Sequence, residues 1–191
     1  MLKRAGAIAL ALGVVLLSAC GPKAPTPTVH ESMTDVMSPQ AQIIWDTTSR
    51  AFNDKGDGLE ASKISETDWT ALAKAGQLLR DRAQVLAKAR HVVAAAPGMA
   101  IMGEQAAGAP STLGHAWDAA SGKKVQAMID TNPALFAQHA RDLAQAGDTL
   151  VKAAGAKDIH ALYDMSSGLD EVCDGCHVKF WGTDEPPPFP R

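Results

Sequence analysis

The stretch that decides the fold spans residues 68–96 and reads DWTALAKAGQLLRDRAQVLAKARHVVAAA. Its large apolar side chains recur every seven residues, at Leu72, Leu79, Leu86 and Val93. This spacing places them on one face of an α-helix. Ser65 and Asp68 have the spacing of a capping box at the start, and Pro97-Gly98 is a stop signal at the end. We therefore predict a helix over residues 68–96.

The same criteria predict three more helices. The first begins at Ser32 or Ser38 and ends at Asn53. Another follows Asn132, where proline comes directly after an N-cap residue, and ends at Gly155; the last spans residues 158–181. Four amphipathic helices bury their apolar faces against one another, so we expect an all-α fold, a four-helix bundle over residues 32–183. The connection over residues 98–130 is rich in glycine, with one short helix possible at 123–129.

The first nineteen residues have the pattern of an export signal. A basic pair at residues 3–4 precedes an apolar run over 5–17, which is shorter than the roughly 20 residues of a membrane-spanning helix. Residues 17–20 read LSAC and resemble the lipobox of bacterial lipoproteins. That resemblance implies cleavage before Cys20 and a lipid on its thiol; an ordinary secretory signal is the alternative. Gly21, by the sorting rule of that family, implies the outer membrane, facing the periplasm.

Two segments, one after the signal and one at the C-terminus, contain few apolar side chains that a core could bury. Residues 20–31 contain three prolines, and we predict a flexible tether there; residues 184–191 are a proline-rich tail. Cleavage of the signal removes two basic residues and no acidic one, so the net charge changes from −3 to −5. A negative surface argues against nucleic acid as a partner, because basic contacts to phosphate dominate that kind of binding.

The last two cysteines lie in Cys173-Asp174-Gly175-Cys176-His177, the pattern of covalent c-type haem attachment. Positions i, i+3 and i+4 share one face of a helix. Two thiols can therefore each add to one vinyl group of a single haem, while the histidine ligates the iron. A thioredoxin-like thiol pair is typically found in a βαβ setting, and a zinc site needs a second pair of ligands. We predict covalent haem at Cys173 and Cys176, with His177 as an axial ligand.

Over residues 31–182 the chain resembles the class II c-type cytochromes, the family of cytochrome c′ and its low-spin relatives. The matching segments are Met33, Ser38-Pro39, Ile44-Trp45-Asp46, Glu66-Thr67-Asp68-Trp69 and the haem motif followed by Phe180-Trp181. The resemblance implies a four-helix bundle with one haem near its C-terminus. It also implies that a methionine of the first helix is the second axial ligand in low-spin members, and that homodimers are possible.

The second axial ligand is the open question at the site. The resemblance favours Met33, but Met33 and Met37 lie one turn apart on one helix face, so the spacing does not separate them. A five-coordinate iron without a second protein ligand is another alternative. A histidine such as His139, which lies near the apolar face of the third predicted helix, is the last.

From these observations we expect an electron carrier rather than an enzyme. A haem iron ligated by histidine and methionine has both axial positions filled, so that it passes single electrons and does not readily bind substrate. The redox partner would be a protein of the periplasm or the membrane. The alternative function, implied by cytochrome c′, is a five-coordinate haem protein that binds or scavenges a small gas such as nitric oxide.

Overall fold

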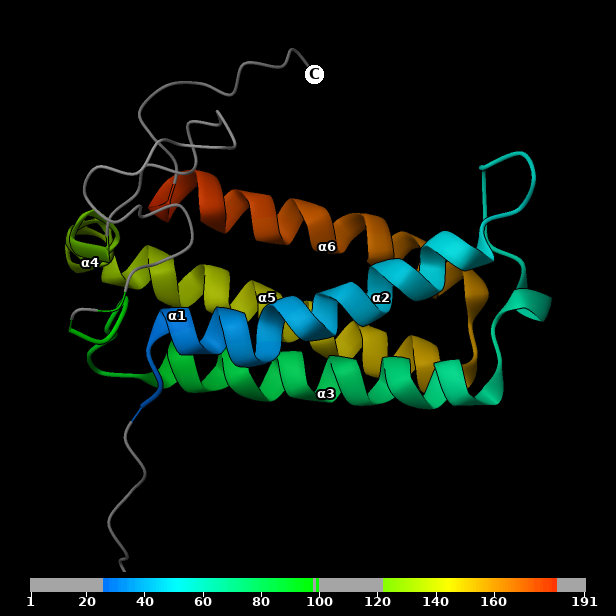
Figure 1. Ribbon diagram of the computed structural model, residues 1–191, viewed down its shortest axis with the longest axis horizontal. Coiled ribbons are helices and arrows are strands. Elements are labelled where there is room, and N and C mark those ends of the chain that lie inside the picture. The colour runs from blue at the N-terminus through cyan, green and yellow to red at the C-terminus, as the bar shows by residue number, and fades with distance from the viewer. Residues whose placement is uncertain (1–25, 98, 100–121, 182–191) are drawn as a thin grey trace, which may run out of the picture.

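The protein is all-helical in the part of the chain that the structure describes, which is residues 26–97, 99 and 122–181 of a computed structural model. The long helices α2 (Ser38–Ala51), α3 (Glu66–Lys88), α5 (Pro133–Ala156) and α6 (Ile159–Phe180) run along the long axis of the molecule (Figure 1). Among the described residues the only β-type pairing is an isolated bridge between Phe52 and Leu59. The prediction of an all-α fold is confirmed.

The first helix is longer than predicted and contains a π-helical segment. It comprises α1 (Val29–Ser32), the π-helix Met33–Met37 and α2 in direct succession. Thr28 and Glu31 form a capping box: the Glu31 N–H donates to Thr28 Oγ1 at 3.1 Å, and the Thr28 N–H donates to the Glu31 carboxylate at 2.8 Å. The predicted starts at Ser32 and Ser38 were therefore wrong, and the last three residues assigned to the tether belong to this helix.

The first helix also ends two residues earlier than predicted, at Ala51 rather than Asn53. Phe52 has an extended backbone, with ψ at 140°. The Asn53 N–H then donates to the Gly58 carbonyl at 2.9 Å and closes a turn. Gly56 lies in this turn with a φ of 72°, a conformation that glycine adopts without strain.

Helix α3 begins at Glu66, two residues before the predicted start, and ends early. The Asp68 N–H donates to Ser65 Oγ, and the Ser65 N–H donates to the Asp68 carboxylate, so the predicted capping box is present. The helix ends at Lys88, eight residues before the predicted end. Beyond it, the Val93 and Ala94 carbonyls accept the Val29 and His30 N–H groups, each at 2.9 Å. These bonds to the first helix replace the helical bonds, so the end predicted at Ala96 was wrong.

The second half of the described chain follows the predicted order. Helix α4 (Gly122–Thr131) covers the short helix expected at 123–129. Helix α5 starts after Asn132 and ends one residue beyond Gly155, where Lys157 adopts a left-handed backbone with φ at 52°. Helix α6 starts after Asp158, whose carboxylate accepts the N–H groups of His160 and Ala161 at 3.1 and 3.0 Å.

The core lies between the long helices, which contact one another as the pairs α2–α3, α3–α5, α5–α6 and α2–α6. The largest fully buried side chains come from all of them: Ile44, Leu72, Leu79, Leu86, Leu150, Leu162 and Leu169. Helices α3 and α5 approach each other closely at two glycines. A Cβ placed on Gly76 would lie 2.7 Å from the Gly147 carbonyl oxygen, and the reverse contact is also 2.7 Å.

None of the helices in the described residues is long and apolar enough to cross a membrane.

Candidate functional site

The three side chains of the predicted haem motif line one cavity. Cys173, Cys176 and His177 project from the last two turns of α6 into a space of about 380 Å³. Its other walls come from α2, α3 and α5, and they are largely apolar: they include Ala41, Leu79, Leu86, Phe136, Ala140 and Leu143. The cavity lies within the size range of pockets that hold small molecules and cofactors.

Met33 and Met37 of the first helix line the same cavity. They are the first and last residues of the π-helix, so that they lie about one turn apart. Met37 is 5 % exposed, whereas Met33 is half-buried against the core. The structure therefore brings both candidate methionines to the cavity that His177 lines, and it leaves the choice between them open.

The environment of Cys173 and Cys176 disfavours the thiolate form of both side chains. Burial raises the pKa of the Cys173 thiol to about 11, and the negative charges of Asp170 and Asp174 add to the effect. Burial raises the pKa of the Cys176 thiol to about 12. Both side chains are therefore thiols at neutral pH. Reactive dithiol pairs need the opposite, a lowered pKa, so this setting disfavours a thioredoxin-like pair.

His177 lies in a partly apolar environment that favours its neutral form. Burial lowers the pKa of the imidazole, and the nearby Asp174 carboxylate opposes part of that shift. Its ring also meets Trp181 edge to face, with centroids 5.4 Å apart. Neutral imidazole is the form that binds metals, so the protonation state suits a ligand.

His139 of α5 also lines the cavity, beside the motif itself. A Cβ placed on Gly175 would lie 3.7 Å from the His139 ring, so the glycine leaves ordinary contact space for the imidazole. The ring packs edge to face on Phe180 at 5.9 Å between centroids. His139 thus stays an alternative ligand, at the wall where α5 meets α6.

Sequence reasoning missed Trp45 as a residue of the cavity wall. Trp45 lines the cavity, and its indole Nε1 is buried without a hydrogen-bond partner among the described residues. The signal that predicts its position is a repeat of four residues along the first helix, through Met33, Met37, Ala41 and Trp45. An indole N–H is a donor only, so a bound group with carboxylate oxygens would suit this wall.

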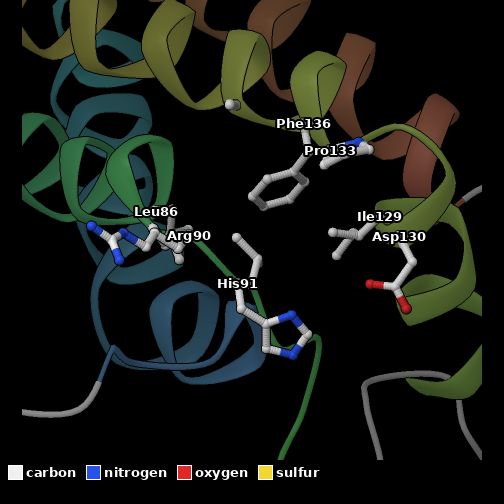
Figure 2. Close-up of a pocket in the computed structure, with 10 residues that line it drawn as sticks. Leu86, Arg90, His91, Ile129, Asp130, Pro133 and Phe136 are labelled. Atoms are coloured by element: carbon white, nitrogen blue, oxygen red, sulfur yellow. The ribbon is translucent and has the colours of Figure 1, made fainter.

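A second, smaller pocket of about 240 Å³ adjoins the first between α3, α4 and α5. It shares Leu86 and Phe136 with the larger cavity, so these two side chains separate the spaces. In Figure 2 the Phe136 ring points from α5 toward Ile129 of α4 and His91 of the segment after α3.

The remaining predicted features lie elsewhere. Cys20, the predicted signal peptide and the proline-rich tail lie outside the described residues. Within residues 26–97, 99 and 122–181, no group of three or more His, Cys, Asp or Glu side chains is placed to hold a metal ion. Comparisons with models of protein families, with curated proteins and with solved structures found no significant match.

Proposed function

We propose that the protein is a c-type cytochrome in which a four-helix bundle, made of residues 29–51 with α3, α5 and α6, holds one covalent haem. One observation carries the proposal: the thiols and imidazole of the motif Cys173 to His177 share a cavity with the thioethers of Met33 and Met37. Thiols, an imidazole and a thioether are the groups that attach and ligate a c-type haem.

The residues of the cavity suit such a group. Cys173 and Cys176 would each add a thiol across one vinyl group, so that sulfur bonds to one carbon and the proton goes to the other. His177 would ligate the iron through its neutral imidazole, and Met33 is our choice for the second ligand. The apolar side chains of α3 and α5 that line the cavity would exclude water from a bound haem. When bound, the haem supplies an iron that alternates between the ferrous and ferric states.

Single-electron transfer is the function that this set of ligands supports best. Held by His177 and a methionine, a bound haem would pass single electrons without binding a substrate, and the methionine would raise its reduction potential relative to histidine. We also propose that the protein is exported and tethered to the outer membrane by lipid at Cys20. If no methionine reaches the iron, the open position supports the binding of a small gas instead.

Acid–acetone extraction followed by a pyridine haemochrome assay tests the proposal. We expect one haem per chain to stay on the wild-type protein, because two thioether bonds hold it. In the double variant Cys173→Ser, Cys176→Ser the haem should extract completely. Ser32→Ala, a substitution outside the cavity, is the control and should retain haem. Wild-type haem that extracts freely would show that the proposal is wrong.

A further inference from the structure

The chain enters the fold beside the cavity. Thr28 caps the first helix, and Met33, only four residues after Val29, already lines the cavity. Four residues of helix span about 6 Å. The Val29 and His30 N–H groups donate to the carbonyls of Val93 and Ala94, each at 2.9 Å, and fix this entry point.

The entry point and the haem motif lie at the same end of the molecule. Gln126 of α4 accepts the Ala94 N–H at 2.7 Å and donates to the Val92 carbonyl at 3.0 Å, so α4 is joined to the segment that holds the first helix. Helix α4 in turn contacts α6. Figure 1 shows the start of α1, α4 and the C-terminal end of α6 together, with the loop after α2 at the other end.

Covalent geometry limits how far this end can lie from a lipid on Cys20. Eight residues, 21–28, separate Cys20 from the first helix. Fully extended they reach roughly 29 Å. The loop that follows α2 lies farther away, because the fourteen residues of α2 span about 21 Å beyond Met37. A lipid at Cys20 therefore limits the distance from the bilayer to the cavity end to roughly this reach, whereas the loop end can lie farther away.

We infer that the cavity end of the bundle faces the membrane, and that the redox partner is a protein held in that membrane. The inference rests on the proposed function, since it needs both the haem and the lipid. Two partners confined to one surface by a short linker meet at a high effective concentration, which a soluble partner lacks. Because the anchor is attached at the cavity end, the high effective concentration applies to the part of the protein that holds the haem.

Moving the anchor to the other end tests the inference. The native lipidated protein is compared with a Cys20→Ala, Lys55→Cys form coupled to a maleimide lipid, since Lys55 is exposed in the loop after α2. Both are bound to phosphatidylethanolamine–phosphatidylglycerol vesicles that contain a fluorescent headgroup. We expect the native form to quench the headgroup fluorescence more strongly, because its haem lies closer. Equal quenching would overturn the inference.

Electron exchange gives the second measurement. The ferrous protein on the same vesicles passes one electron to a ferrocenium-headed lipid, leaving ferric iron and ferrocene. We expect this oxidation to be several-fold slower for the Lys55→Cys anchor. Soluble ferricyanide should oxidise both forms at one rate, which shows that the haem itself is unchanged. Equal rates with the lipid probe favour a soluble partner and overturn the inference. Absence of covalent haem in either form refutes the proposed function itself.

Discussion

Met33 and Met37 differ in what their removal should do, although they line the same cavity. If Met33 ligates iron, Met33→Ala opens an axial position. We expect the ferric absorption spectrum to change from low-spin to high-spin, and carbon monoxide to bind the ferrous protein rapidly. In the wild type that binding should be slow, because the methionine must leave first. A wild-type protein that is already high-spin would favour the gas-binding function.

Met37→Ala serves as the matched control. Met37 is 5 % exposed, so its truncation leaves a cavity in the core. We expect a stability loss of about 2–5 kcal/mol in urea unfolding, with the low-spin spectrum retained. Met37→Leu, which conserves volume, should cost less than about 1.5 kcal/mol. If Met37→Ala rather than Met33→Ala gives the high-spin spectrum, the two roles are exchanged.

The cysteines and His177 could be predicted from five consecutive residues, because their spacing alone places them on one helix face. The other walls of the cavity cannot be predicted in that way, because they depend on how distant helices pack. Trp45 and His139 reach the cavity from two other helices. The choice between Met33 and Met37 also depends on the π-helix, which the sequence pattern did not show.

At the scale of the element, the capping box of α3 predicts a pH dependence. The Ser65 hydroxyl, its N–H and then Arg50 lower the pKa of Asp68. Because the pKa of Asp68 is lower in the folded than in the unfolded protein, the carboxylate stabilises the fold at pH values above its unfolded pKa. This stabilisation is lost as the pH falls through the pKa of the folded protein. Ser65→Ala should cost about 1 kcal/mol at neutral pH.

Urea midpoints at neutral and acid pH measure this effect. The difference between wild type and Ser65→Ala should shrink in acid, because the protonated Asp68 no longer accepts the capping bonds. Thr67→Ala, in the same exposed turn, should show no such change with pH. A difference that is constant across pH would contradict the role of Asp68.

The contact between Gly76 and Gly147 leaves no room for a side chain between α3 and α5. A Cβ on Gly76 would lie 2.7 Å from a backbone oxygen, which cannot move aside without the helix. We expect Gly76→Ala to destabilise the protein by about 1–3 kcal/mol in thermal or urea unfolding, since overpacking outweighs the gain in helix propensity.

Gly168→Ala in α6 is the control for this substitution. Its Cβ would meet nothing within 4 Å, so the helix gains propensity without a clash. We expect a stabilisation of up to about 1 kcal/mol. Equal effects of the two substitutions would show that the approach of α3 and α5 does not limit stability.

The existence and order of the helices could be predicted from apolar spacing, whereas the end of α3 could not. Val93 continues the seven-residue repeat of α3, yet it is 37 % exposed and its carbonyl bonds to Val29. That bond joins residues 64 positions apart, so no local pattern announces it. The start at Val29 does have a local signal, because Thr28 and Glu31 have the spacing of a capping box.

At the scale of the whole molecule, the proposed lipid at Cys20 should determine where the protein is found. In a Gram-negative host, the wild type should fractionate with membranes and incorporate radioactive palmitate. Cys20→Ala should lose the label and appear in the soluble fraction, because no other group attaches it to lipid in the proposal. If the variant labels and fractionates like the wild type, Cys20 is not the site of attachment.

The glycine contact between α3 and α5 would act as a pivot if the two helices tilted against each other. The α3 and α5 residues of the cavity, Leu79, Leu86, Phe136, Ala140 and Leu143, all lie on one side of it along their helices. Rocking these helices apart at that end presses them together at the other, where Leu72 and Leu150 are fully buried. Close-packed interiors resist such compression. We therefore expect the proposed haem to enter while the helices are still assembling, and the finished bundle to retain it.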